Sequence, residues 1–310
     1  MITPRPTVAI ARSVTLAACV ALGCGSSDEP TDAGSDAGES DGAREDAASD
    51  AGVPACALAA STSPTGVTTN GCALLDRDTS SCRAARQGQG LGGLWLAFSC
   101  RVSLEKTSVG GKDVVRVRAD GQPDYPSAYF PMSDPCWTAR TSGLQNPNRI
   151  AAKSMQMDVP LATSGSATAT GLGPVGLAVN GVALFDNRAA PGDDIFLEAR
   201  TFDACGGHPS PDGSYHYHSE PYAISYDDAR LIGVLRDGSP VYGRRDADGS
   251  TPALDADGGH MGTTADSPTA AVYHFHVNPQ TSTAGTSAGQ TQFFLTKGRY
   301  HGAPGTCTGC

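Results

Sequence analysis

Histidines at a repeated spacing are the residues of this sequence most able to do chemistry. The chain holds seven of them, and two alternate with tyrosines in "YHYH" (Tyr215–His218). Nearly the same pattern returns in "YHFH" (Tyr273–His276). A Gly-Gly-His sequence precedes each pattern and ends at His208 or at His260. Six of the seven histidines therefore stand at equivalent positions in two stretches of the chain.

Alternation decides where these side chains point. In a strand, residues two apart lie on one face, about 6.6–7 Å from each other, and their neighbours point to the other face. His216 and His218 should therefore point together, with Tyr215 and Tyr217 opposite. We predict an aromatic face packed in a core and an imidazole face. The two glycines before His208 permit the close backbone approach that brings in a third imidazole.

Three histidines with an open position are the ligand set of a catalytic or exchangeable metal site. Neutral imidazole suits zinc, copper, iron and nickel, whereas proton transfer alone does not need six histidines. We predict a copper or zinc site, either two three-histidine sets or one six-histidine cluster. The predicted ligands are His208, His216, His218, His260, His274 and His276. The alternative is that the histidines only pack on a half-buried sheet.

Other polar residues accompany each Gly-Gly-His sequence. Asp203 and Asp255 each stand five residues before its histidine. They are candidates for extra ligands or for hydrogen-bond acceptors that fix a histidine tautomer. The alternative is an aspartate that stabilises the turn. Cys205 lies at a ligand-like spacing from its histidine, but its counterpart is Asp257, which favours a disulfide instead.

The histidines belong to a longer duplicated unit. Each copy begins with apolar runs around a hairpin signal, Asn180-Gly181 or Asp237-Gly238. The Gly-Gly-His loop and the alternating strand then follow in the same order. Abundant Gly (38) and Pro (21), with 17% charged residues, also favour a turn-rich β protein. We predict a mostly β, antiparallel, sandwich- or barrel-like domain over residues 159–310, built on an internal duplication.

Residues 55–158 contain short apolar runs separated by turns. "VVRVR" (Val114–Arg118) has the alternation of a half-buried strand. We interpret the segment either as additional strands of the same fold or as a small subdomain that contains cysteines. Eight cysteines remain when Cys19 and Cys24 are set aside from the ten. This even number in an exported chain predicts up to four structural disulfides, whose connectivity the sequence does not give.

Residues 1–24 have the pattern of a lipoprotein-type signal peptide. The apolar run Ser13–Gly23 follows two arginines and is too short to span a bilayer. Cys24 follows a lipobox-like sequence, and we predict its lipidation, although Cys19 fits the consensus better with a shorter apolar run. Gly25 next to it favours the outer membrane. The alternative is a secretory signal without an anchor.

Residues 25–54 form an acidic stretch of low complexity. Ser26–Gly52 holds nine acidic residues against Arg44, which accounts for eight of the ten net negative charges. Such a composition cannot bury enough apolar surface to fold, so we predict a disordered tether. The remainder is nearly neutral and has no cluster of Lys or Arg. Nucleic acid is therefore not an expected partner.

Several blocks in the same order resemble the YHYH domain family of bacterial secreted and lipid-anchored proteins. They are "NPNRI" (Asn146–Ile150), "GPVGLAVNGVALFD" (Gly173–Asp186), "DACGGHPSPDGSYHYH" (Asp203–His218), "LIGVLRDGSPVYG" (Leu231–Gly243), "LDADGGH" (Leu254–His260) and "YHFHV" (Tyr273–Val277). The sequence departs from the family pattern at Phe275 and at Cys205. The resemblance implies export and a fold, but no activity.

Taken together, the sequence predicts an exported protein of the cell envelope, anchored to the outer membrane by lipid, that binds copper or zinc. One alternative is a metal-dependent oxidoreductase or hydrolase that uses the same histidines. Another is a structural or adhesive surface module. An enzyme would place an acid or base and a cleft beside an open metal position, whereas a binding protein can close its coordination.

Overall fold

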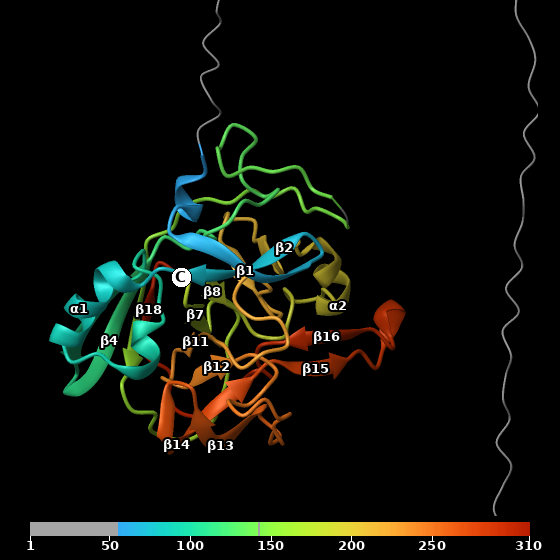
Figure 1. Ribbon diagram of the computed structural model, residues 1–310. Helices are drawn as coiled ribbons and strands as arrows, with labels where there is room; N and C mark the ends of the chain where they lie inside the picture. The colour runs from blue at the N-terminus through green and yellow to red at the C-terminus, as the bar shows by residue number, and fades with distance from the viewer. Residues whose placement is uncertain (1–54, 142) are drawn as a thin grey trace, which may run out of the picture. The chain divides into compact units, whose positions relative to one another are not determined.

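Eight of the strands within residues 159–310 form one sheet in the computed structural model of the chain, which describes residues 55–141 and 143–310 (Figure 1). The order across this sheet is β13-β14-β12-β11-β7-β8-β10-β9. The strands are β7 (Gly176–Ala178), β8 (Ala183–Leu184), β9 (Gly207–Pro209), β10 (Tyr215–Tyr217), β11 (Leu231–Leu235), β12 (Pro240–Tyr242), β13 (Gly259–Thr264) and β14 (Ser267–His276).

The order of strands is the same from the middle of this sheet to either edge. β7 and β11 form the central pair. On each side of this pair the second strand of the hairpin (β8 or β12) comes first, then the strand with alternating histidines (β10 or β14), and finally the Gly-Gly-His strand (β9 or β13). The two halves of the sheet therefore have the same strand order. Two pairs differ from the expected antiparallel pattern, because β10 is parallel to β8 and β14 is parallel to β12. In both halves the chain leaves the hairpin and first forms the edge strand, β9 or β13. The next strand, β10 or β14, then lies between the edge strand and the hairpin and runs parallel to the second hairpin strand.

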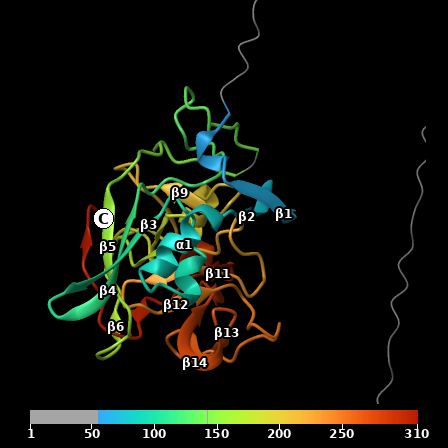
Figure 2. The ribbon, with the colours of Figure 1, turned by 60° about the vertical axis from the view of Figure 1, so that its left-hand side comes forward.

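A second sheet comes mostly from the upstream segment. It contains β3 (Ser103–Val109), β4 (Lys112–Ala119), β5 (Met155–Pro160) and β18 (Cys307–Thr308), all antiparallel, in the order β18-β5-β4-β3. Figure 2 shows β3, β4 and β5 side by side. The "VVRVR" stretch lies in β4, and its buried Val115 and Val117 join one apolar core with Leu177 and Val234 of the larger sheet. The boundary expected between residues 158 and 159 falls within β5.

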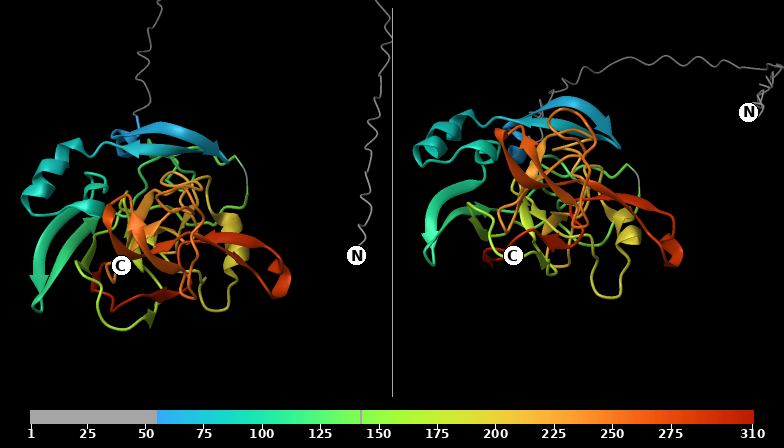
Figure 3. Two further views of the ribbon diagram at one scale, coloured as in Figure 1. Left: turned by 60° about the horizontal axis from the view of Figure 1, so that its bottom comes forward. Right: turned by 90° about the horizontal axis from the view of Figure 1, so that it is seen from below.

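Short elements complete the described residues. The β3–β4 and β15–β16 hairpins lie on opposite sides of the ribbon in Figure 3. The remaining strands are β1 (Thr62–Thr69), β2 (Cys72–Arg77), β6 (Thr168–Ala169), β15 (Asn278–Thr281), β16 (Thr291–Phe294) and β17 (Arg299–Tyr300). The helices are α1 (Ser80–Gly88), α2 (Ile195–Glu198) and the 3-10 turns η1 (Ala57–Ala59), η2 (Gly93–Leu96), η3 (Ala199–Thr201) and η4 (Gly285–Ser287). The prediction of a mostly β protein is confirmed, and across residues 55–141 and 143–310 no sheet closes into a barrel.

Disulfides join all eight cysteines of the described residues. The pairs are Cys56–Cys136, Cys72–Cys205, Cys82–Cys100 and Cys307–Cys310. The prediction of a disulfide-stabilised fold is confirmed. Cys205 is bonded to Cys72 and ties β2 to the loop that leads into β9, so this sulfur is a structural link rather than a metal ligand.

The predicted signal peptide, the lipidation site Cys24 and the acidic tether lie outside the described residues. Within residues 55–141 and 143–310, none of the helices combines the length and the apolar character needed to cross a membrane.

Candidate metal sites

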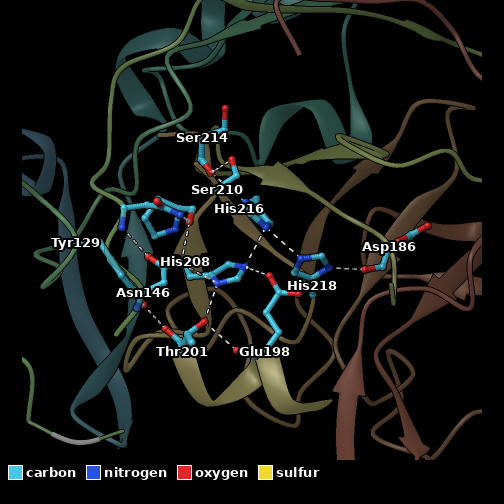
Figure 4. Close-up of polar contacts among 12 residues, drawn as sticks. Tyr129, Asn146, Asp186, Glu198, Thr201, His208, Ser210, Ser214, His216 and His218 are labelled. Carbon is cyan, nitrogen blue, oxygen red and sulfur yellow. Dashed lines mark hydrogen bonds and ion pairs between the residues drawn. The ribbon is translucent and has the colours of Figure 1, made fainter. Parts of the chain in front are cut away.

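The first three histidines come together at the edge of the large sheet. His208 on β9 stands directly opposite His216 on β10, and His218 follows β10 by one residue. The Nε2 atom of His216 lies 3.1 Å from Nε2 of His208 and 3.0 Å from Nε2 of His218 (Figure 4). All three side chains are buried. The alternation therefore places the imidazoles on one face, as the sequence predicts.

The opposite face of β10 is aromatic and packed. Tyr215 and Tyr217 are buried, and their hydroxyl groups lie 3.0 Å and 2.6 Å from the hydroxyl of Tyr125. A Cβ atom on Gly207 would lie 2.5 Å from the Tyr215 ring. The glycine before His208 is therefore required because the neighbouring tyrosine lies against the backbone of β9. Gly206, with φ of +92°, makes the left-handed turn that starts the strand.

Backbone carbonyl groups fix the tautomers of two histidines. His216 donates its Nδ1 hydrogen to the carbonyl oxygen of Ser214 at 2.9 Å. His218 donates its Nδ1 hydrogen to the carbonyl oxygen of Asp186 at 2.6 Å. A carbonyl oxygen only accepts, so Nδ1 of both rings carries the hydrogen. In the neutral rings, Nε2 is therefore left with a free lone pair.

His208 reaches the same tautomer through a hydroxyl group. The Thr201 hydroxyl donates to the carbonyl oxygen of Glu198 at 2.8 Å, and its oxygen lies 2.8 Å from Nδ1 of His208. Because the hydroxyl hydrogen is already used, the ring nitrogen is the donor in the second contact. The amide nitrogen of Asn146 lies farther from this Nδ1, at 3.5 Å, and makes its shorter hydrogen bond to the carbonyl oxygen of Pro209 at 2.9 Å. Nε2 of His208 thus presents a lone pair in the same way as its two neighbours.

Burial keeps these rings neutral. It lowers the pKa of His208 to about 3 and that of His218 to about 4, and it places the pKa of His216 well below its usual value. The Nε2 atom of His216 therefore faces those of His208 and His218 across 3.1 and 3.0 Å, and the three ligand atoms lie within 4.8 Å of one another. Nitrogens bound tetrahedrally at about 2.0–2.1 Å from a zinc ion are separated by about 3.3 Å, so the spacing fits a shared cation.

A carboxylate and a cleft adjoin the first set. Oε1 of Glu198, at the end of α2, lies 3.4 Å from Nε2 of His208, and its Oε2 is buried without a hydrogen bond. Burial raises the pKa of Glu198. A cleft of about 390 Å³ reaches His216, His218 and Glu198 and also contains Leu172.

Glu198 was not among the predicted site residues. The equivalent positions Asp186 and Gly243 are 57 residues apart, whereas the equivalent histidines His208 and His260 are 52 apart. The connection that leads to the Gly-Gly-His histidine is therefore five residues longer in the first unit. Glu198 lies in this longer connection. Comparison of the two units therefore gives no signal for it.

The second set repeats the arrangement and adds an aspartate. Nε2 of His260 lies 3.2 Å from Nε2 of His276, and His274 lies opposite His260 in the β13–β14 pair. Oδ1 of Asp246 lies 3.1, 3.3 and 3.7 Å from Nε2 of His260, His276 and His274. This oxygen is buried and has no hydrogen-bond partner in the part of the chain that the structure describes. Four potential ligand atoms therefore converge at this site.

The tautomers of two histidines in the second set are fixed in the same way. His274 donates its Nδ1 hydrogen to the carbonyl oxygen of Val272 at 3.0 Å, and His276 donates to that of Gly243 at 2.7 Å. Burial lowers the pKa of His274, and it lowers the pKa of His276 to about 4. Main-chain oxygens accept these hydrogen bonds. The side chains at the accepting positions can therefore differ between the two units without changing the histidine tautomers.

Asp203 and Asp255 stabilise turns. Asp203 accepts hydrogen bonds from the backbone of its own loop and from the Tyr215 hydroxyl at 2.7 Å. Asp255 does the same with the Tyr273 hydroxyl at 2.8 Å. Their hydrogen bonds go to backbone amides and hydroxyls, so the tautomer-fixing role belongs to the carbonyls and to Thr201. The two aspartates instead hold the tyrosine strands against the Gly-Gly-His loops.

The six predicted ligands form two separate groups rather than one cluster. One group is His208, His216 and His218, and the other is His260, His274, His276 and Asp246. Asp246 was missed by sequence reasoning. It lies in the connection between Gly243 and His260, whose length differs from that of the first unit, so comparison of the two units gave no signal for it either.

The fold and these sites define a disulfide-bonded β protein with two histidine clusters at opposite edges of one sheet. A protein-family model described as YHYH protein matches residues 156–269, which include the whole first unit and the second as far as its Gly-Gly-His loop. Residues 156–269 therefore match the YHYH family model, and the resemblance seen in the sequence is confirmed. Comparison with curated proteins and with solved structures found no match.

Proposed function

We propose that the protein binds two transition-metal ions, copper or zinc, one at each histidine cluster. The observation that carries the proposal is the convergence of lone pairs in the first cluster, where every Nδ1 atom already serves as a donor. Neutral imidazole nitrogens are preferred ligands of zinc and copper. A shared cation turns the repulsion between the lone pairs into three coordinate bonds.

A purely packing role fits these contacts poorly. Histidines that only pack would find protein partners on both ring nitrogens and would stand farther apart. Here the Nε2 atoms of neighbouring rings are separated by 3.0–3.2 Å, and their nearest polar neighbours are other imidazoles and two carboxylates. The geometry therefore favours metal binding over a structural or adhesive role.

We further propose that this binding occurs outside the cytoplasm, on a protein anchored to the outer membrane through lipidated Cys24. The four disulfides support export, because disulfides form and persist in oxidising compartments. The apolar run before Cys24 supports it independently. In this setting the protein would capture or hold copper or zinc at the cell surface.

The test is metal analysis of the purified full chain after exposure to excess copper or zinc and removal of unbound metal. We expect about two ions per chain. His218→Asn and His276→Asn should each lose one ion, and the double variant should lose both. Asparagine keeps a donor for the carbonyl groups of Asp186 and Gly243 but removes the ligand nitrogen, so the local structure is preserved.

His301→Asn is the matched control. This seventh histidine lies outside both clusters and stacks on the ring of Tyr273. It should retain both ions. The proposal is overturned if the unmodified protein retains no stoichiometric metal, or if the double variant retains as much metal as the unmodified protein. Circular dichroism of each variant verifies that it is folded.

A further inference from the structure

We infer that the two sites have different roles: the second closes around its metal, whereas the first keeps an open coordination position for an external ligand. We expect this ligand to be a small molecule with two parts. One part is an oxygen or nitrogen donor atom that carries a hydrogen, and the other is an apolar group. This inference rests on the proposed function and extends it to the first site.

The second site has a complete set of four protein ligands. Oδ1 of Asp246 lies within 3.7 Å of all three imidazole Nε2 atoms, and it makes no other hydrogen bond. Three histidines and one carboxylate fill the four positions of a tetrahedral zinc ion. Closed sites of this kind are structural, because no position is left for a further ligand.

The first site lacks the fourth ligand. Among residues 55–141 and 143–310, its donor atoms that all lie within 4.8 Å of one another belong to His208, His216 and His218 alone. Three histidines with a free fourth position are the ligand set of catalytic zinc sites. The tertiary structure therefore separates two sites whose histidine patterns are nearly identical.

Glu198 stands beside the free position rather than in it. Its Oε1 is close to His208 alone, and its Oε2 is buried without a partner. A buried carboxylate oxygen without a partner is costly, so a ligand that donates a hydrogen bond to it would bind more tightly. The open coordination position and the Glu198 carboxylate together favour one kind of ligand. Its donor atom binds the metal, and a hydrogen on that atom or on a neighbouring atom is donated to Glu198.

The cleft beside the first site provides apolar side chains that would contact the apolar group of the ligand. Its volume of about 390 Å³ is lined by the ligands His216 and His218 and by Leu172, Phe185 and Pro191. The ring of Phe185 stacks on His216 with centroids 3.8 Å apart. The size and the mixed lining are those of small-molecule sites. The metal-dependent oxidation or hydrolysis considered above would also take place here.

The test uses cobalt(II), whose visible absorption reports a change of coordination, and benzohydroxamate as the ligand probe. Protein with the His276→Asn substitution holds cobalt only at the first site, and its spectrum should change on titration. Protein with His218→Asn holds cobalt only at the second site, and its spectrum should not change. Acetohydroxamate, which lacks the apolar ring, should bind the first site at least tenfold more weakly.

Removal of the carboxylate from the second site provides the matched control. Asp246→Ala, made together with His218→Asn, should open the second site to the probe. A response from the second site of the His218→Asn protein, or none from the first site of the His276→Asn protein, would overturn the inference. Cobalt content is measured separately, so loss of metal from both sites identifies a failure of the proposed function instead.

Discussion

At the scale of single residues, the choice of ring nitrogen is what turns histidines into ligands. In both units the second and third histidines bind backbone carbonyl oxygens through Nδ1. The partners include Ser214 in one unit and Val272 in the other, which have no side-chain property in common. Main-chain acceptors therefore preserve the tautomer while the sequence around the site varies.

The metal-free protein should lose stability as the pH falls from about 6.5 to about 4.5. Burial lowers the pKa of His208 to about 3 and of His218 and His276 to about 4, from 6.5. In this range the unfolded chain binds more protons than the folded chain, so the free energy of unfolding decreases. Each histidine contributes up to about 1.4 kcal/mol per pH unit. Urea unfolding at pH 7.5 and pH 5 measures the effect.

His218→Asn isolates the histidine contribution. Burial also raises the pKa of Glu198, which stabilises the folded state toward low pH and opposes the effect of the histidines. The comparison with the variant cancels most of this opposing effect, because both proteins retain Glu198. The variant should lose less stability between the two pH values than the unmodified protein. An equal loss in both proteins would show that His218 is not a buried neutral ring in solution.

At the scale of elements, the Gly-Gly-His strand and the tyrosine strand are built for each other. Gly207 lies against the ring of Tyr215, and Gly259 lies in the same way against the ring of Tyr273. A Cβ atom at either glycine would come within 2.5 or 2.6 Å of the tyrosine ring. The glycine thus sets how closely the two strands approach, and with it the distance between their histidines.

Gly207→Ala should therefore weaken metal binding at the first site and leave the second intact. The added methyl group must displace β9 from the Tyr215 ring, at a cost of about 1–3 kcal/mol in stability, and His208 moves with the strand. We expect an affinity loss of about tenfold or more in a metal titration of protein that also carries His276→Asn.

Gly88→Ala is the control for this substitution, because a Cβ atom there meets nothing within 4 Å and the residue lies in α1. It should leave metal affinity unchanged. Gly259→Ala should produce the mirror result, with loss at the second site. If Gly207→Ala keeps full affinity and stability, strand spacing does not control the first site.

At the scale of the whole molecule, one sheet holds both sites apart. The first cluster lies at the β9–β10 edge and the second at the β13–β14 edge, with the hairpin strands between them. Strands from the upstream segment share the same apolar core, and one disulfide joins that segment to the loop before β9. The upstream residues therefore support the loop before β9, since Cys72 is bonded to Cys205.

Export and anchoring yield a prediction for the intact protein in a bacterial host. Cys24→Ala should move the protein from the outer-membrane fraction to the soluble periplasmic or secreted fraction, because the lipid-bearing residue is removed. Cys19→Ala is the matched control and should leave the protein membrane-bound. Fractionation followed by immunoblotting measures both. Retention of the Cys24→Ala protein in the membrane would exclude Cys24 as the anchor, and release by Cys19→Ala would assign that role to Cys19.

The sequence by itself determined the features that depend on local periodicity. Alternation in "YHYH" placed His216 and His218 on one face and the tyrosines on the other, because successive side chains of a strand point in opposite directions. The repeated order of hairpin, glycine loop and alternating strand predicted a mostly β fold. The even number of cysteines predicted disulfides in general terms.

Only the tertiary structure decided the features that join distant residues. The disulfide pairs, the parallel direction of β10 beside β8 and the carbonyl partners of Nδ1 depend on where the chain returns. Glu198 and Asp246 likewise become neighbours of the histidines through connections of different length, which no local pattern specifies. Two nearly identical histidine motifs thus acquire different surroundings, because a ligand set is completed by residues that folding brings together from outside the motif.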